Sequence, residues 1–182
     1  SGIHYGDTTH GAENAWSAVG SMDNDSFRVA DGEMVTRADM TFGGAKIGIS
    51  LGDDTNISGT DKDYISLGIT GSAGSLSYAL AHQNANTTTV DLDDNSAATQ
   101  LATTGVRVST TWGGATVALG HANNDNGGST GVEVSYPMGA FTTTASYVQE
   151  GATGAENNWD VKFVYAADAV GLTVATDESQ DW

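Results

Sequence analysis

The sequence predicts an all-β protein, an antiparallel up-and-down β-barrel that spans a membrane. Three observations predict it: a composition that favours strands and turns, about ten segments that alternate with period two, and connections that are alternately short and long. No apolar run approaches the ~20 residues that a transmembrane helix needs. Since only helices and closed barrels satisfy every backbone polar group in lipid, the spanning elements must be strands.

The composition supports strands and excludes several classes of function. The chain has 24 Gly, one Pro, no Cys and 38% hydrophobic residues, while Thr and Val are well represented. Its six Lys and Arg against 23 Asp and Glu give a formal charge of −17, which would repel nucleic acid. The absence of cysteine rules out disulfides, thiolate metal sites and cysteine nucleophiles, so the sequence predicts no nucleic-acid partner and no thiol chemistry.

Period-two alternation predicts ten strands that form five β-hairpins between residues 33 and 176. They are expected near 33–42, 45–52, 62–71, 75–83, 103–112, 115–122, 131–138, 141–149, 159–167 and 170–176. Tight turns are expected at 43–44, 71–74, 113–114, 139–140 and 168–169, and long polar loops at 53–61, 84–102, 123–130 and 150–158. Short turns at one end and long loops at the other are typical of outer-membrane barrels.

The two faces of these strands differ in character. One face carries Val, Leu, Ile, Met and aromatic residues without a charge, and the other is polar except at Val35, Tyr64, Val148 and Val164. Aromatic residues of the apolar face gather near the two ends of the strands, as they do at lipid interfaces. A soluble β-sandwich with its apolar face buried is the alternative that the alternation alone leaves open.

Most of the few basic residues share the polar face in the middle of strands: Arg37, Lys46, Arg107 and Lys162. A Lys or Arg on the lipid side near the bilayer midplane costs roughly 2–4 kcal/mol, so a position on the water-filled side is expected for them.

Residues 1–32 depart from this pattern. Ser1 to Gly6 reads as the end of a strand, and residues 7–21 contain Ala12, Trp16 and Val19 at near-helical spacing, with Thr9 as a possible N-cap. An acidic stretch follows up to residue 31. A long loop with a short helix over 7–32 is therefore expected before the hairpins.

A strand end, a long loop that opens with YGDTTHGAENA and then regular hairpins resemble the general porins of Gram-negative bacteria, in particular the Rhodobacter-type porins of α-proteobacteria. The resemblance covers essentially the whole chain, 1–182, as a single barrel domain. It implies a water-filled channel of the outer membrane for passive diffusion of small polar solutes and ions, a homotrimer, and contact with membrane lipid and lipopolysaccharide.

The resemblance also implies how much of a barrel is present. If Ser1 to Gly6 ends a fifth strand, the ten strands that follow are the sixth to fifteenth of a sixteen-stranded barrel, and the chain is a fragment. A complete smaller barrel of ten or so strands is the alternative.

In such porins basic side chains on the wall face acidic side chains on an inserted loop. The resemblance therefore implies wall positions for Arg37 and Lys46, with Arg107 and Lys162 as further candidates. It implies loop positions for Asp23, Asp25, Asp31 and Glu33. Neutralising Arg37 and Lys46 together is expected to raise cation selectivity.

The sequence predicts no enzyme and no cofactor. His4, His10, His82 and His121 are scattered, and no metalloprotease, nucleophile-elbow or phosphate-loop motif is present. The acidic segments 53–54, 91–94 and 123–126 could bind Ca²⁺, although solvated surface loops are the favoured interpretation. Two other functions remain open at this point: a secreted calcium-binding β-sandwich adhesin or surface-layer module, and a small barrel enzyme of the outer membrane.

Overall fold

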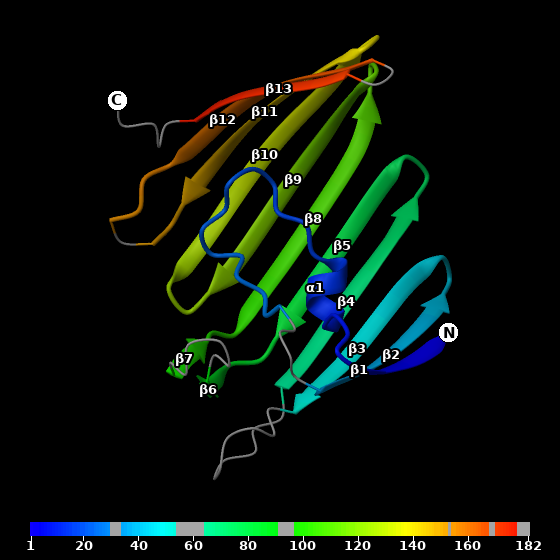
Figure 1. Ribbon diagram of the computed structural model, residues 1–182, viewed down its shortest axis with the longest axis vertical. Coiled ribbons are helices and arrows are strands. Elements are labelled where there is room, and N and C mark those ends of the chain that lie inside the picture. Colours follow the sequence, from blue (N-terminus) through cyan, green and yellow to red (C-terminus); the bar gives the residue numbers. More distant parts are fainter. Residues whose placement is uncertain (30–33, 54–63, 91–96, 153, 168–169, 178–182) are drawn as a thin grey trace.

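Eleven strands of the computed structural model form one antiparallel sheet in which each strand lies beside its neighbour in sequence, apart from a short separate hairpin (Figure 1). The structure describes residues 1–29, 34–53, 64–90, 97–152, 154–167 and 170–177. The order is β1-β2-β3-β4-β5-β8-β9-β10-β11-β12-β13, with β6 and β7 as the separate pair. Among the described residues, β1 and β13 each have one strand neighbour in the main sheet.

The strands have the following bounds: β1 Gly2–Gly6, β2 Met34–Phe42, β3 Ala45–Asp53, β4 Tyr64–Ala73, β5 Leu76–Gln83, β6 Asn86–Val90, β7 Ala97–Gln100, β8 Thr103–Trp112, β9 Ala115–Asn124, β10 Gly127–Met138, β11 Phe141–Glu150, β12 Asn158–Ala167 and β13 Val170–Asp177. The ten strands predicted from alternation are thus confirmed. One helix, α1 Gly11–Ala15, lies between β1 and β2. No helix in the described part of the chain is long and apolar enough to cross a membrane.

Two of the predicted long loops are wrong. The connection expected at 123–130 is a two-residue turn, because β9 continues to Asn124 and β10 begins at Gly127. The amide N–H of Asn126 donates to Oδ1 of Asn124 at 2.9 Å and closes this turn. The segment expected as a loop at 84–102 contains β6 and β7. Both errors arose because polar strand segments were interpreted as loops, although Thr-rich stretches favour strands wherever backbone partners are present.

The sheet has an inner face, which the loop of residues 7–29 covers, and an outer face, which carries the apolar side chains. Leu51, Ile65, Leu119 and Phe163 of the outer face are each about half exposed or more. A β-sandwich would bury this face, so the exposure argues against the sandwich alternative.

The outer face also carries the aromatic residues expected near the strand ends. Phe42, Trp112 and Phe141 lie beside short turns and are well exposed. Tyr147 and Trp159 form a cross-strand pair toward the other end and are also exposed. Two groups of amphipathic rings separated by aliphatic residues match the two interfaces of a bilayer.

We predict that a positive charge destabilises the protein much more at one of two adjacent residues of β10 than at the other. Val134→Arg places a cation on the outer face, where it should lower the free energy of unfolding by ~2–4 kcal/mol in lipid. Ser135→Arg places the same cation on the inner face and should cost much less. Urea unfolding of both variants in phospholipid vesicles measures the difference, and equal losses would contradict the assignment of the two faces.

Candidate functional site

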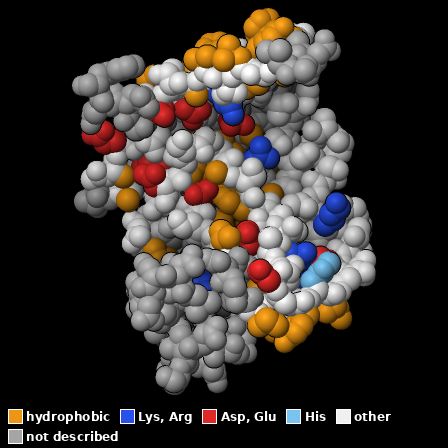
Figure 2. All heavy atoms as spheres, in the orientation of Figure 1, with side chains coloured by type: hydrophobic (Ala, Val, Ile, Leu, Met, Phe, Trp, Pro, Cys, Tyr) orange, Lys and Arg blue, Asp and Glu red, His pale blue; other side chains and the backbone are white. Residues whose placement is uncertain are grey.

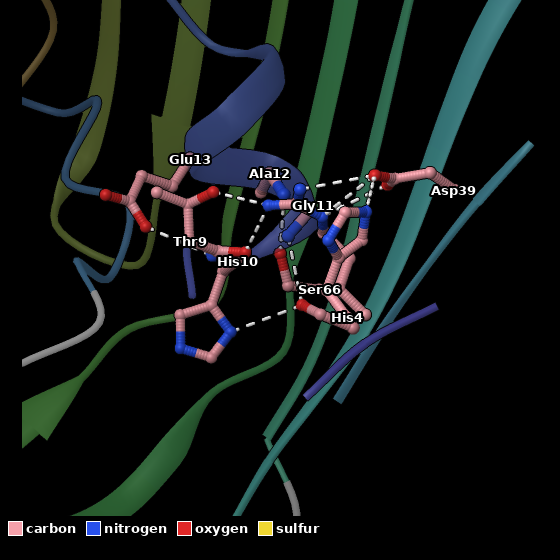
Figure 3. Close-up of polar contacts among 10 residues, drawn as sticks. His4, Thr9, His10, Gly11, Ala12, Glu13, Asp39 and Ser66 are labelled. Carbon is pink, nitrogen blue, oxygen red and sulfur yellow. Dashed lines mark hydrogen bonds and ion pairs between the residues drawn. The ribbon is translucent and has the colours of Figure 1, made fainter. Parts of the chain in front are cut away.

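The loop of residues 7–29, here called the inner loop, begins with a helix that is bound to two strands through its backbone. The amide N–H of Gly11 donates to Oγ of Ser50 at 3.0 Å, and that of Ala12 donates to Oγ of Ser66 at 2.7 Å. The first N–H groups of a helix have no partner within the helix, so these two serines of β3 and β4 satisfy them. Figure 3 shows the start of the helix lying directly on the strands. The helix thereby has a fixed position on the sheet.

The N-cap of this helix differs from the prediction. His10, and not Thr9, occupies the N-cap position, and its amide N–H donates to Oε2 of Glu13 at 3.1 Å. The helix ends at Ala15, so Trp16 and Val19 lie beyond it. Thr9 instead accepts hydrogen bonds from Arg37, through both its carbonyl and its hydroxyl oxygen. The guanidinium of Arg37, on β2, therefore binds Thr9, the residue that was expected to cap the helix.

Arg37 lies on the inner face as predicted, but the inner loop covers it. The whole residue is only 7% exposed, and Nη1 donates to the Thr9 carbonyl at 2.7 Å. Nε donates to Oδ1 of Asp39 at 3.0 Å, and Oδ2 of Asp39 also lies 2.9 Å from Nε2 of His4. Figure 3 shows His4, Asp39 and Thr9 around this position. The guanidinium thus binds the beginning of the loop to β2 and is not presented to a passing solute.

Small residues on the inner face make room for the loop. A Cβ added at Gly68 would lie 1.9 Å from the carbonyl oxygen of Gly11, and one at Gly105 would lie 2.4 Å from the ring of Trp16. A Cβ at Gly131 would lie 2.4 Å from the carbonyl oxygen of Val19. These positions belong to a track of small residues across six strands, Gly48, Gly68, Ala81, Gly105, Gly120 and Gly131. The track was not predicted, although glycines in the polar phase of mid-strand segments were a visible signal for it.

A small apolar cluster holds the middle of the loop. Val19 and Met22 of the loop are buried with Ala118, Ala122 and Val148 of the wall, and Trp16 packs against them. Val148 is one of the apolar exceptions on the polar face, and it has no exposed surface. Its presence on a polar face is therefore explained by the loop that covers it.

The second half of the loop is bound to β10, β11 and β12, which lie away from α1 along the same face of the sheet. Glu150 of β11 accepts from the Asp23 amide at 3.1 Å and from Nδ2 of Asn24 at 3.0 Å. Asn24 also donates its amide N–H to Oγ of Ser129 at 2.9 Å. Asn158 of β12 donates to the Ser21 carbonyl at 2.9 Å. The loop therefore crosses the inner face from β3 and β4 to β12.

Three further hydrogen bonds hold the end of the loop against β5 and β8. Gln83, which is 1% exposed, accepts from the amide of Arg28 at 2.8 Å and donates to the Ser26 carbonyl at 3.0 Å. Thr103 donates to the same carbonyl at 3.0 Å. The loop is consequently fixed at its beginning, its middle and its end.

The acidic residues predicted on the loop have different surroundings. Oδ2 of Asp25 accepts from Nε1 of Trp16 at 2.9 Å, and burial raises the pKa of this carboxyl, while the Trp16 bond opposes the shift. Asp23 is exposed. Asp31 and Glu33 lie outside the described residues.

Lys46 and Arg107 line one recess beside the inner loop. This recess of about 360 Å³ is bordered by Ala15 and Ser17 of the loop and by hydroxyl side chains of β4 and β5. Lys46 is exposed, and Nε of Arg107 is buried without a hydrogen-bond partner among the described residues. The structure therefore brings together two of the four predicted wall cations, one from β3 and one from β8.

Lys162 lines a second recess on the other side of the loop. Glu133 and Asp160 border the same space of about 410 Å³, with Gly20 and Ser21 on the loop side. Two carboxylates therefore accompany this cation, in contrast to the first recess, which has none. Figure 2 shows basic and acidic side chains around the loop on this face.

Calcium binding was predicted at three acidic segments of the chain. The side chains of 53–54 and 91–94 lie outside the described residues. Among the residues that are described, including 123–126, no group of three His, Asp or Glu side chains is placed to hold a metal ion. Calcium binding therefore stays a prediction.

Comparisons with known proteins agree on one family. The sequence model of the Gram-negative porins matches residues 2–181. A triple mutant of Rhodopseudomonas blastica porin superposes with a TM-score of 0.75 at 16% identity, over 96% of this chain and 67% of that one. A porin refined at 1.8 Å gives 0.72 at 11% identity, over 99% and 73%.

A loop-deletion mutant of OmpT, an outer membrane protein of Vibrio cholerae, gives a TM-score of 0.57 at 11% identity, over 96% of this chain and 70% of that one. At such identities the likeness to these structures establishes the fold. Comparison with curated proteins finds no match.

We predict that Gly68→Ala displaces α1, because the new methyl group would overlap the backbone of Gly11. Amide hydrogen exchange at Gly11 and Ala12 should rise at least about tenfold, which corresponds to ~1.4 kcal/mol of lost local stability. Gly171→Ala is the control, since the nearest heavy atom to the added Cβ, apart from the chain neighbours, is the Tyr165 carbonyl oxygen at 3.9 Å, an ordinary van der Waals distance. Unchanged exchange in Gly68→Ala would show that the helix is not seated on the glycine track.

We also predict that Asp25→Asn stabilises the protein at pH 7. The asparagine carbonyl can still accept from Trp16, and no charge is then desolvated. Because burial raises the pKa of Asp25, the gain should be largest above that raised pKa, decline as the pH falls through it, and vanish below the ordinary value of 3.8. Melting temperatures of both proteins across this range test the sign, and a gain that grows toward low pH would contradict it.

Proposed function

The chain belongs to the Gram-negative porin family, and from that premise we propose which residues of its inner face act on the solutes that pass. It is an outer-membrane porin, a water-filled channel for passive diffusion of small hydrophilic solutes and ions. We propose that Lys46 and Arg107 form the cationic part of the channel wall and attract the anionic end of a solute.

The observation that carries this proposal is the recess that the two cations share. Lys46 is exposed there and Arg107 is partly exposed, so both positive charges border the same space. Thr70, Ser72 and Ser77 add hydroxyl groups to the same space. A carboxylate or phosphate of a solute could accept hydrogen bonds from several of these groups, whereas an apolar solute would leave them without partners.

The other two basic residues contribute less to this attraction. Asp39 lies against the guanidinium of Arg37, which the loop covers, so that its charge is largely compensated. Lys162 lies among Glu133 and Asp160 and adds little net positive charge. The field on the inner face is consequently uneven, with its cationic part at the recess of β3 and β8.

The loop acidic residues supply the opposite sign. Asp23 and Asp25 lie in the half of the loop that Glu150 holds, away from the end that α1 occupies. A dipolar solute that crosses this face would therefore meet cations on the wall and carboxylates on the loop, which would orient it. Asp31 and Glu33 stay candidates for the same role.

Fixation of the loop favours a permanent constriction over a gate. Hydrogen bonds hold its beginning, its middle packs in an apolar cluster and is bound to β11, and its end is bound to β5 and β8. Opening the channel by moving the loop would break all of these contacts together. Passage is therefore proposed to depend on the size and charge of the solute.

The assembly state is a further part of the proposal. A homotrimer is expected from the family resemblance, and the exposed apolar outer face offers surface for contact with a second copy as well as with lipid. Lipopolysaccharide is proposed as a neighbour of the same face.

We predict that Lys46→Gln combined with Arg107→Gln raises the cation-to-anion permeability ratio about fivefold. Two charges ~8 Å from an ion in water contribute ~1 kcal/mol together, screening by ~0.1 M salt roughly halves this, and the remainder acts with opposite sign on the cation and the anion. Reversal potentials of single channels in a salt gradient measure the ratio. Lys162→Gln should change the ratio less, because Glu133 and Asp160 lie beside it.

Ser72→Gln is the second control, since it alters the lining of the same recess without a charge. An unchanged ratio in the double variant, with normal conductance, would remove both cations from the path of the ions.

A further inference from the structure

The outer face ends in a polar row at the long-loop end of five neighbouring strands. The row consists of His82 on β5, Thr104 on β8, His121 and Asn123 on β9, Thr130 on β10 and Gln149 on β11. Strand register connects them, since His82 pairs with Thr104 and Thr104 with Asn123, while His121 pairs with Thr130 and Thr130 with Gln149. All six are exposed.

The two histidines of this row are oriented in the same way. Nδ1 of His82 lies 2.8 Å from Oγ1 of Thr104, and Nδ1 of His121 lies 2.9 Å from Oγ1 of Thr130. Each cross-strand threonine therefore fixes one ring nitrogen and leaves Nε2 as the ring atom available to a ligand. Within the described part of the chain, neither Nε2 has a hydrogen-bond partner.

The side chains of His121 and Asn123 both lie over Gly128. A Cβ added at Gly128 would lie 3.2 Å from Cε1 of His121 and 3.2 Å from Nδ2 of Asn123. Because position 128 carries no side chain, the imidazole and the amide can approach the same point on the surface. The row therefore offers several nitrogen donors within a short stretch of sheet.

Immediately toward the middle of the strands the outer face becomes apolar. Leu80, Val106, Leu119 and Tyr147 lie two residues from members of the row and are all exposed. The row thus marks the boundary between the apolar band and water on the side of the long loops. In outer-membrane barrels the long loops face outside, so this boundary lies at the headgroups of the outer leaflet.

An apolar hollow of about 150 Å³ adjoins this boundary between β4, β5 and β8. Leu67, Ile69 and Leu80 line it, and His82 and Thr104 lie at its polar rim. A hydrocarbon segment fits such a hollow, while the rim suits a polar group that accepts hydrogen bonds.

We propose that His82 and Thr104, with His121 and Asn123 beside them, bind the phosphate of an outer-leaflet lipid whose acyl chain lies in this hollow. Phosphate oxygens accept from imidazole, hydroxyl and amide donors, and the row itself contains no carboxylate, although the whole chain carries a formal charge of −17. Glu150, which follows Gln149 in the chain, turns its carboxylate to the inner loop, and Asp125 lies in the turn after β9. The site lies on the opposite face of the sheet from Lys46 and Arg107, so it is independent of the residues proposed for solutes.

The test uses the purified porin in detergent with dioleoyl phosphatidic acid as the probe and native mass spectrometry as the readout. His82→Leu should weaken binding of this lipid about tenfold, the effect expected for a lost charge-assisted or phosphate hydrogen bond. His4→Leu is the matched control, because it removes a histidine from the inner face, and it should leave binding unchanged. Equal loss in both variants would overturn the proposal.

A second variant tests the acyl part of the site. Leu67→Trp should fill the hollow and weaken phosphatidic acid binding while leaving His82 and Thr104 in place, so it remains informative if His82→Leu does not fold. Full binding in Leu67→Trp would show that the hollow holds no acyl chain.

Inorganic phosphate distinguishes a lipid site from a site for the free ion. An equimolar amount should not displace the lipid, because the free ion lacks the acyl contacts. Displacement at equal concentration would overturn the assignment to lipid.

Discussion

The inner loop can lie on this sheet only because the strands beneath it carry glycine or another small residue where the loop approaches them most closely. Its backbone approaches Gly68 and Gly131 so closely that a methyl group at either position would overlap a carbonyl oxygen. Close approach in turn lets Ser50 and Ser66 accept the first N–H groups of α1. An irregular segment inside a barrel must satisfy its backbone polar groups, and here the wall provides the partners. Loop position, and with it the width of the passage, depends on this fit.

The path of the inner loop also decides which basic residues a solute can contact and which are covered. Arg37 is bound beneath the loop, whereas Lys46 and Arg107 border a recess that the loop leaves open. All three share the inner face and the same phase of alternation. Their different roles arise from where the loop crosses the strands, and a solute therefore meets a subset of the basic residues.

The outer face has a comparable division between apolar and polar parts. Aliphatic side chains occupy the middle of the strands, and His82 and His121 stand where the polar connections begin. One sheet thus has two separate polar environments, an inner one exposed to water and an outer one at the edge of the lipid. Strand alternation keeps them apart, because successive side chains point to opposite faces.

The sequence by itself determined the strands and the assignment of each side chain to a face, because alternation is a local property of the chain. It also indicated the family, and it placed the basic residues on the inner face. Tertiary structure alone decided that Arg37 is covered, that Lys46 and Arg107 meet across β3 and β8, and that Glu150 holds the loop. These contacts join residues that are far apart in the sequence, and no local pattern encodes the path by which an irregular loop crosses a sheet.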